Sequence, residues 1–393
     1  GYIAAVKAFR ALAYLVHGRM YEYLPTDVTS GVNDDGNDVT GLTVPIVKEG
    51  MSEADARNNP RVKKEDLIKF IKEDLEYAEQ NIGKLTKTEK TLPHLDCVYG
   101  LEARLYMWEG DYAKAQAAAE NAIKASSVKP MTQAQCLNTT TGFNNLADFM
   151  WGSQQTSEDA VVSTGIINWT SWMCNEQTFG YCGAGTGDYI RIDTLAYTRL
   201  NDTDFRKLEW VAPAGSPIAN KVSFVNKTYG ASMPPMASVK FRPNQGEMDA
   251  PSVAAATAFP VMRVEEMYYI RMEAAAQQEA AKGKERGEGF MKTRDPKYKG
   301  KATSKEDIIK EIYFQKCIDL WGEGITFFDM KRLNYSLTRG YHGTNHSVGA
   351  RINTNGRPAT TNFLFYRTEA ENNTALKGWN NPDPSGKYPL WTE

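Results

Sequence analysis

The residues best suited to binding chemistry are aromatic side chains in a polar, glycine-rich segment between residues 168 and 191. They are Trp169, Trp172, Tyr181 and Tyr189. Aromatic residues of a protein core usually occur in periodic apolar company, whereas these have asparagine, glutamine, threonine and glycine as neighbours. Sugars present flat apolar C–H faces ringed by hydroxyl groups, and exposed aromatic rings beside hydrogen-bonding side chains suit both features. The segment therefore predicts a platform for a carbohydrate.

Polar side chains of the same segment could complete such a platform. Asn175, Asp188 and Arg191 offer amide, carboxylate and guanidinium groups that would hydrogen-bond to sugar hydroxyls. The alternative is that the rings pin this loop to the rest of the protein. The composition leaves both interpretations open for each ring.

Patterns typical of catalysis are missing from the sequence. It contains no nucleophile elbow, no P-loop and no dinucleotide-binding fingerprint in the right context. His342 and His346 have the spacing of helical metal ligands, but their glycine-rich surroundings indicate a solvated loop. The adjacent acids Glu265–Glu266 and Asp34–Asp35 carry no sign of the acid and nucleophile that glycoside hydrolysis requires. We therefore expect a protein that is not an enzyme.

The sequence signals for a metal site and for a disulfide are equally weak. Asp34, Asp35 and Asp38 carry oxygens suited to calcium but lack the full EF-hand pattern, so a solvated loop is favoured and a structural calcium ion stays open. We expect no other cofactor. Among the five cysteines, Cys174 and Cys182 are close enough to bridge one loop, and two unpaired thiols are the alternative.

The charge balance argues against nucleic acid as a partner. The chain has 46 basic and 48 acidic residues, whereas nucleic-acid binding usually shows a basic excess on one face. The basic run from Lys282 to Lys301 is expected to be a solvated loop. No stretch approaches the roughly 18 apolar residues of a membrane helix. Because the chain begins at Gly1 inside a helical pattern, we expect a further segment to precede it.

Hydrophobic spacing of three and four residues predicts the main elements. Helices are expected at residues 1–24, 65–82, 98–108, 112–123, 261–281 and 306–333. The apolar pattern of the first helix includes Ile3 and Val6, and that of the second includes Leu67, Ile71 and Leu75. Long irregular segments are expected at 26–60 and from 339 onward, and a loop-rich region with strand-like runs at 149–151 and 222–225 lies between. Thr303 and Glu306 predict a capping box at the start of the last helix.

The helix pair between Val98 and Ile123 resembles a tetratricopeptide unit. Gly110 and Asp111 separate the two helices, and alanines at helical spacing follow, which lets antiparallel helices approach closely. One such unit cannot bury its own apolar face, so further helix pairs must stack on it. The sequence thus predicts a mostly α protein. Its segments are a tetratricopeptide-like scaffold at 1–130, a loop-rich ligand-binding region at 131–255, and C-terminal helices and loops at 256–393.

Three stretches resemble conserved motifs of the SusD/RagB family, in order and over nearly the whole chain. They are Lys7–Tyr14 (KAFRALAY), Phe259–Ala274 (FPVMRVEEMYYIRMEA) and Glu323–Arg332 (EGITFFDMKR). Thr326 departs from the arginine that the family commonly has. We interpret these motifs as scaffold, with Arg263 paired to Glu266 or Glu273 and Glu323 paired to Arg332.

The resemblance implies a non-catalytic, glycan-binding lipoprotein on the bacterial outer membrane. Such a protein would be attached to the membrane by an N-terminal lipid anchor outside this chain. It would deliver an oligosaccharide or polysaccharide to a SusC-like TonB-dependent transporter. Ligand residues vary within the family, so the site residues above rest on local composition alone. Two alternatives stay open: a helical-repeat scaffold for protein interactions, and capture of a non-glycan nutrient such as a peptide.

Overall fold

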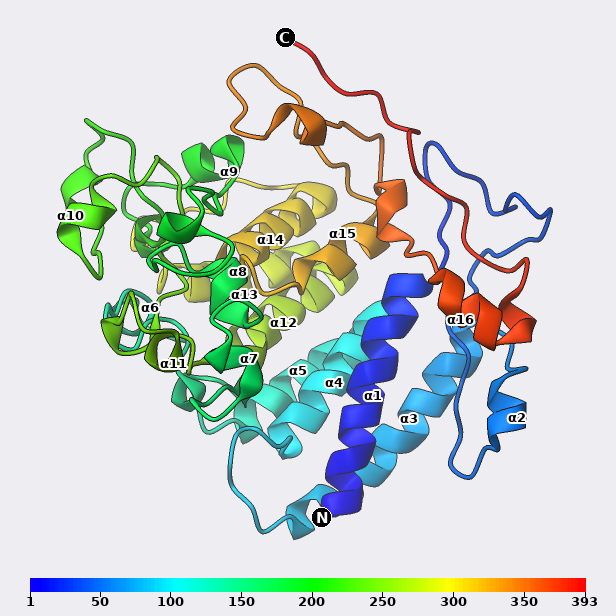
Figure 1. The fold of residues 1–393 in the computed structure, drawn as a ribbon. Coiled ribbons are helices and arrows are strands. Elements are labelled where there is room, and N and C mark those ends of the chain that lie inside the picture. Colours follow the sequence, from blue (N-terminus) through cyan, green and yellow to red (C-terminus); the bar gives the residue numbers. More distant parts are fainter. The chain divides into compact units, whose positions relative to one another are not determined.

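Helices provide most of the regular structure in the computed structural model, which describes all residues from 1 to 393 (Figure 1). The chain folds into two units: residues 1–86, 104–111 and 324–393 form unit 1, and residues 87–103 and 112–323 form unit 2. Unit 1 holds α1 (Tyr2–Tyr21), α2 (Glu53–Ala56), α3 (Lys64–Asn81), α15 (Thr326–Leu333) and α16 (Arg367–Asn372). Helix α4 (Leu95–Glu109) contributes residues to both units.

Unit 2 contains long helices and a loop-rich part. The long helices are α5 (Tyr112–Ala125), α12 (Val264–Gln278), α13 (Ala280–Met291) and α14 (Lys305–Asp319). The loop-rich part carries the short helices α6 (Gln133–Cys136), α7 (Ala160–Ser163), α8 (Trp169–Met173), α9 (Thr194–Arg199), α10 (Lys227–Gly230) and α11 (Pro251–Ala254). Its strands are β1 (Trp151–Gln154) and β2 (Ala258–Met262). The prediction of a mostly helical protein with a loop-rich region is confirmed.

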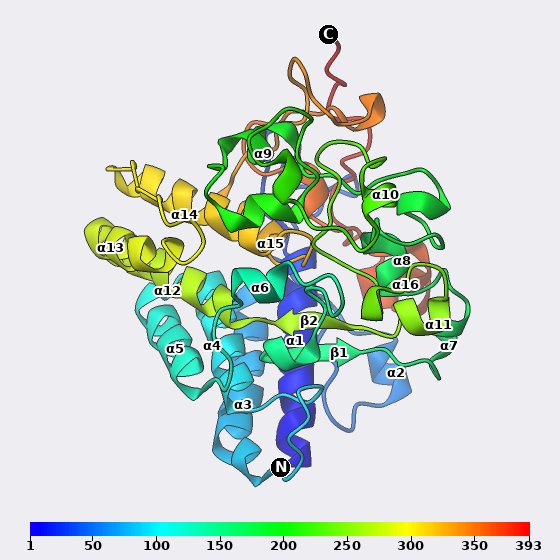
Figure 2. The same cartoon turned by 90° about the vertical axis from the view of Figure 1, so that its left-hand side faces the viewer.

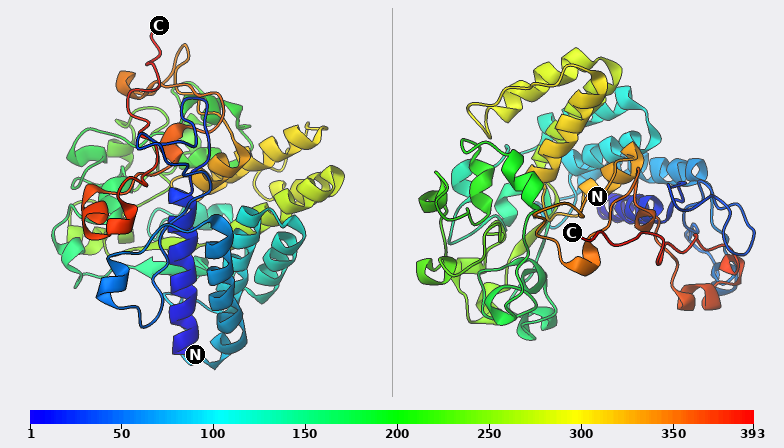
Figure 3. Two further views of the ribbon diagram at one scale, coloured as in Figure 1. Left: turned by 90° about the vertical axis from the view of Figure 1, so that its right-hand side faces the viewer. Right: turned by 90° about the horizontal axis from the view of Figure 1, so that it is seen from above.

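Helices α1 and α3 run side by side in unit 1 (Figure 3, left). The predicted buried face of α3 is confirmed, since Leu67, Ile71 and Leu75 are all buried. The face of α1 differs from the expected one: Ile3 and Val6 are exposed, and the buried residues are Ala4, Ala5, Ala8, Ala11, Leu15 and Gly18. Small side chains permit a shorter distance between helix axes, so this stripe packs inward in place of the larger residues.

Helix α12 is the centre of the helical layer in unit 2. It packs against α5, α13 and α14, which lie together on the left of Figure 2. The alanines expected at the α5 interface, Ala115, Ala119 and Ala122, are buried. A Cβ atom at Gly283 of α13 would lie 2.4 Å from the Cβ of Ala276 in α12, so glycine allows these two helices to touch.

Three sequence predictions for this part of the chain are wrong in detail. The first half of the basic run 282–301 lies in helix α13, not in a loop. The helix expected at 306–333 is two helices, α14 and α15, separated by residues 320–325. The N-terminal cap of α14 is Ser304, whose hydroxyl accepts a hydrogen bond from the Asp307 amide, one residue after the expected start.

The loop-rich part of unit 2 contains one two-stranded antiparallel sheet. β1 pairs with β2, with Ser153 opposite Phe259 (Figure 2). The strand-like run at 149–151 therefore leads into a real strand, whereas residues 222–225 form no strand. The two units do not follow the expected segments 1–130, 131–255 and 256–393, since each unit contains residues from more than one of them. A separate ligand-binding role for residues 131–255 stays a prediction.

Candidate functional site

Helix α8 positions the first half of the candidate site. It is a single turn whose start is fixed by Asn168, because the side-chain oxygen of Asn168 accepts a hydrogen bond from the Ser171 amide at 2.9 Å. Trp169 points to the interior and meets Phe241 edge-on at 4.6 Å between ring centroids. Trp172, three residues on, is 54% exposed.

The chain folds back after α8, and this brings Tyr181 next to Trp172. The Tyr181 amide donates a hydrogen bond of 2.9 Å to the carbonyl of Ser171. Gly180, with φ at +89°, makes this return possible, since a Cβ atom there would lie 2.6 Å from the Ser171 hydroxyl. The rings of Trp172 and Tyr181 then stack, with centroids 4.3 Å apart and planes inclined by 26°. We call this pair the aromatic platform.

The aromatic platform is open to solvent although its two rings cover each other on one side. Tyr181 is 45% exposed and Trp172 slightly more, so each ring presents its remaining face or edge outward. Neither the indole N–H of Trp172 nor the hydroxyl of Tyr181 hydrogen-bonds to another residue, so both can bind an external partner. Apolar ring surface beside free polar groups is the combination that suits a sugar.

A buried polar layer supports the loop beneath the aromatic platform. Asn175 is fully buried, and its amide donates hydrogen bonds to the carbonyls of Ile190 and Ser238 at 2.8 and 2.9 Å. Its side-chain oxygen accepts from the Ile190 amide at 2.9 Å. Glu176 forms a buried ion pair with Arg242 and accepts from the Val225 amide at 2.8 Å. Burial raises the pKa of Glu176 despite the arginine beside it.

The expected ligand role of Asn175 is therefore wrong. All of its hydrogen-bonding groups are used inside the protein, and the residue holds residues 174–176 against two neighbouring segments. Trp169 is half-buried and stacks on Phe259 at 5.8 Å in addition to Phe241, so it ties α8 to β2. The pinning interpretation describes this ring better than a sugar platform.

The other predicted residues lie on the chain that follows the aromatic platform. Tyr189 is half-buried against an apolar cluster that includes Val211 and Met233, and its hydroxyl lies 3.3 Å from that of Tyr229. Arg191 is exposed, and its Nε donates to the Pro235 carbonyl at 3.1 Å. Asp188 is exposed. The structure thus brings together Trp172 and Tyr181, while Asp188 and Arg191 remain available at the surface.

A cavity in the same loop-rich part escaped the sequence analysis. It has a volume of about 1030 Å³ and is lined by residues from 137–139 and 211–235, including Asn138, Asn220 and Phe224. The Tyr229 hydroxyl donates to the Asn175 carbonyl at 2.9 Å, so this wall is tied to the loop that carries the aromatic platform. Only Val222, Ser223 and Phe224, within a run expected to be a strand, gave any signal in the sequence.

Cys174 and Cys182 are free thiols in the structure, and both are buried under the same loop. The Cys182 thiol donates to the Cys174 carbonyl at 3.0 Å. Burial raises the pKa of Cys182 to about 12, so this thiol stays protonated at neutral pH. Of the two alternatives for these cysteines, the structure has the unpaired thiols.

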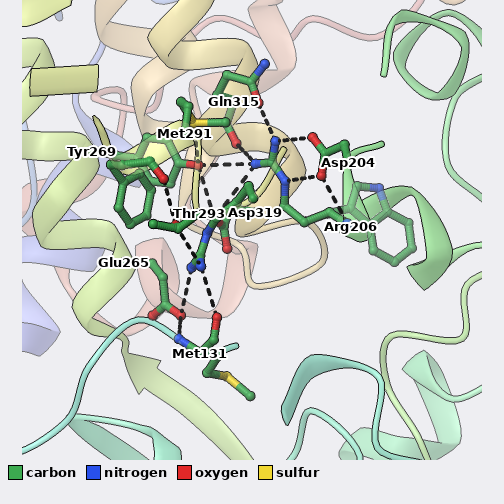
Figure 4. A network of polar contacts seen from close by, with 12 residues as sticks. Met131, Asp204, Arg206, Glu265, Tyr269, Met291, Thr293, Gln315 and Asp319 are labelled. Carbon is green, nitrogen blue, oxygen red and sulfur yellow. Dashed lines mark hydrogen bonds and ion pairs between the residues drawn. The ribbon is translucent and has the colours of Figure 1, made fainter. Parts of the chain in front are cut away.

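One of the acids considered for hydrolysis, Glu265, lies in a buried network, the ion-pair cluster (Figure 4). Four cations balance four carboxylates within it: Arg206, Lys240, Arg263 and Arg294 with Asp204, Glu265, Asp319 and Glu323. All eight side chains are at most 5% exposed. Glu265 and Glu323 are thus bound to cations inside the protein, an arrangement of structural ion pairs.

The ion-pair cluster also corrects the expected motif pairs. Arg263 pairs with Glu265 at 2.9 Å, Glu323 at 3.0 Å and Asp319 at 3.1 Å. Glu323 also forms an ion pair with Lys240, with 2.8 Å between Nζ of Lys240 and Oε1 of Glu323. Arg332 pairs with Asp329 on its own helix at 2.7 Å. The motifs are scaffold as expected, but the partners are different.

Two further observations concern metals and membranes. No group of three or more histidine, cysteine or acidic side chains is arranged to hold a metal ion, and this includes the loop with Asp34, Asp35 and Asp38. No helix combines the length and the apolar character needed to span a membrane.

Comparison with known proteins identifies the fold. No protein-family model matches the sequence, and no curated protein is similar to it. Solved structures do match: a SusD-like carbohydrate-binding protein from Bacteroides vulgatus has a TM-score of 0.70 at 18% identity, over 97% of this chain and 78% of its own. A SusD superfamily protein from Bacteroides thetaiotaomicron has a TM-score of 0.67 at 17% identity, over 95% and 76% of the two chains.

A laminarin-binding SusD-like protein also matches, with a TM-score of 0.53 at 15% identity, over 84% of this chain and 70% of its own. The architecture is thus a helical scaffold that carries a loop-rich part. More specifically, this chain has the SusD-like fold.

Proposed function

We propose that this protein captures an oligosaccharide or polysaccharide without catalysis, with Trp172 and Tyr181 as the main contact surface. The observation that carries the proposal is the exposed, stacked pair of rings on a loop of a SusD-like fold. The carbohydrate-binding and laminarin-binding proteins of the same fold support a glycan as the ligand. Asp188 and Arg191 are exposed nearby along the chain and would bind sugar hydroxyls.

The proposed setting is the surface of a bacterial outer membrane. There the protein would be a lipoprotein that passes its ligand to a SusC-like TonB-dependent transporter. Delivery requires release, and an open platform of two rings favours modest affinity because each sugar contact competes with water. The SusD-like fold and the motif resemblance support this setting.

Isothermal titration calorimetry against soluble laminarin, starch, xylan and pectin tests the capture. We expect saturable binding to one glycan class, and an increase in Kd of at least about tenfold in Trp172→Ala, which corresponds to about 1.4 kcal/mol. Tyr181→Ala should act in the same direction. Tyr366→Ala is the matched control, because Tyr366 is 77% exposed but lies in unit 1.

The outcomes separate the alternatives. Binding that survives both platform variants would keep glycan capture and reject this site. No binding to any glycan would favour a peptide ligand or a protein-interaction scaffold. New reducing ends after prolonged incubation with the bound glycan would contradict the non-catalytic role.

A further inference from the structure

A second cavity lies in the helical layer of unit 2, apart from the aromatic platform. It is formed by α12, α13 and residues 130–133, and its volume is about 880 Å³. In Figure 2, α12 and α13 lie on the left and α8 lies on the right. A cavity of this volume is in the range of sites for small molecules. We call it the cation pocket.

The charges that line the cation pocket are unbalanced. Four of its lining residues are cations, Arg271, Lys282, Arg286 and Arg294, and one is a carboxylate, Glu285. Three of the cations have partners elsewhere. Arg286 pairs with Glu120, Lys282 with Glu279 at 2.6 Å, and Arg294 with Asp319 at 3.0 Å and Glu265 at 3.4 Å.

Arg271 is different, because its side chain has no carboxylate partner and makes no hydrogen bond. Its Nε is buried without an acceptor. The guanidinium lies 4.8 Å from the centroid of the Tyr268 ring, which itself stacks on Phe290 at 4.8 Å. Burial lowers the pKa of Arg271 and the positive charge of Arg286 acts in the same direction, while Tyr268 and the carboxylate of Glu120 oppose the shift. The Nε of this half-buried guanidinium therefore lacks an acceptor inside the protein.

Arg61 of unit 1 shows how this protein satisfies a buried guanidinium that has no carboxylate. Its N–H groups donate to the carbonyls of Thr43, Leu42, Tyr21 and Trp379 and to the side chain of Asn381, at 2.8 to 2.9 Å. Nothing comparable surrounds Arg271. Arg271 lines the cavity, so a ligand there would find a guanidinium that no protein group has engaged.

We infer that the cation pocket is a binding site for an oxyanion, the carboxylate or sulfate group of a small polar ligand, with Arg271 as the principal contact. A planar guanidinium fits such a group with two parallel hydrogen bonds. Arg286 adds a second guanidinium, and Thr132, Gln133 and Thr293 offer polar groups to the rest of the ligand.

Calorimetry or ligand-observed NMR with defined probes tests the inference. The probes are D-glucuronate, its neutral counterpart D-glucose, inorganic sulfate and inorganic phosphate. We expect glucuronate to bind, glucose to bind at least tenfold more weakly, and added salt to weaken the binding of glucuronate. Tighter binding of glucuronate than of sulfate or phosphate would identify a carboxylated sugar as the ligand. Equal binding would identify the free oxyanion.

Two variants locate the site. Arg271→Gln should abolish glucuronate binding, whereas Arg367→Gln, at an arginine that is exposed in unit 1, should leave it unchanged. Arg271→Gln should also unfold at the same temperature as the natural protein or at a higher one, because it removes an unsatisfied cation. A merely structural arginine would instead lower the unfolding temperature.

Three results would overturn the inference. They are the absence of saturable anion binding, equal affinity for glucose and glucuronate, and unchanged binding in Arg271→Gln. The test is independent of the proposed function, since Trp172→Ala should leave glucuronate binding at this pocket intact. Loss of glycan binding in Trp172→Ala together with loss of glucuronate binding in Arg271→Gln would confirm two separate sites.

Discussion

The ion-pair cluster and the aromatic platform lie in the same structural unit, and they differ in where their polar and aromatic groups find partners. Every cation of the ion-pair cluster meets a carboxylate inside the protein, and water is excluded. The rings of the aromatic platform stack on each other and are about half exposed, and their N–H and O–H groups make no hydrogen bond within the protein.

This difference separates residues that hold the fold from residues that are free to bind. Removing one member of a buried ionic network leaves an uncompensated charge, whereas removing an exposed ring leaves a smaller surface. The comparison therefore predicts large losses of stability without a specific effect on binding in the ion-pair cluster. At the aromatic platform it predicts a specific loss of binding with little loss of stability.

The largest expected effect is at Asp319, which contacts Arg206, Arg263 and Arg294. Burial alone would raise the pKa of Asp319, but the surrounding arginines hold it well below its usual range. Asp319→Asn removes the charge that these arginines share, so the free energy of unfolding should fall by about 3–5 kcal/mol. Urea denaturation at pH 7 measures it. Glu306→Gln, in an exposed pair with Lys310, is the control and should change stability by about 0.5 kcal/mol at most.

The same site gives a prediction for acid. Because the pKa of Asp319 is lower in the folded protein than in the unfolded chain, its stabilising effect is present above its ordinary pKa of 3.8 and is lost as the pH falls below it. Asp319→Asn should therefore show a weaker loss of stability between pH 4 and pH 2 than the natural protein. Equal acid sensitivity of both proteins would contradict the assigned role.

The next largest effect is expected at Gly183, on the loop that carries Tyr181. Gly183 has φ at +69°, and a Cβ atom there would lie 2.2 Å from the Asn175 carbonyl oxygen. Gly183→Ala should cost about 3 kcal/mol of unfolding free energy and disturb Tyr181. Gly187→Ala is a matched control in the same loop, with φ at +79° and no atom within 4 Å of the new Cβ. It should cost only about 1 kcal/mol, and similar losses in both variants would reject the clash.

Glu209 predicts a smaller effect that depends on pH. Burial raises its pKa to about 7 from 4.5, although Lys240 and Arg263 oppose the shift. The folded protein thus holds this proton more tightly than the unfolded chain, so stability falls as the pH rises from about 4.5 to 7. Glu209→Gln should raise the free energy of unfolding by about 2 kcal/mol at pH 8.5 and leave it nearly unchanged at pH 4.5. An equal change at both pH values would contradict the burial of a neutral acid.

The fold could be predicted from the sequence where large aliphatic residues mark one helix face. Leu67, Ile71 and Leu75 of α3 are an example, since few other residues of that helix could fill a core. Helix α1 misled the prediction because its alanines pack inward and leave Ile3 and Val6 outside. Helix α13 was missed because glycines among charged residues are typical of loops, and only the contact with Ala276 explains Gly283.

The candidate site could be predicted only in outline. The aromatic composition pointed to the loop that carries the aromatic platform, but the Trp172–Tyr181 pair depends on a backbone hydrogen bond between residues ten apart. Composition also cannot distinguish the buried amide of Asn175 from an exposed one. Asp319 was missed as a partner of Arg263 because it belongs to none of the recognised motifs.

The smallest expected effect on stability is at the aromatic platform itself, and it decides whether the comparison holds. Trp172→Ala removes an exposed ring and one stacking contact, so the free energy of unfolding should change by no more than about 1 kcal/mol. Trp169→Ala is the matched control on the same helical turn, because Trp169 packs on Phe241 and Phe259 and should cost about 3 kcal/mol or more. Urea denaturation of both variants, together with calorimetry against the bound glycan, measures the contrast. A Trp172→Ala protein as unstable as Trp169→Ala would show that the outer ring also pins the loop, and the surface that binds glycan would then have to be sought at the cavity lined by Asn138, Asn220 and Phe224.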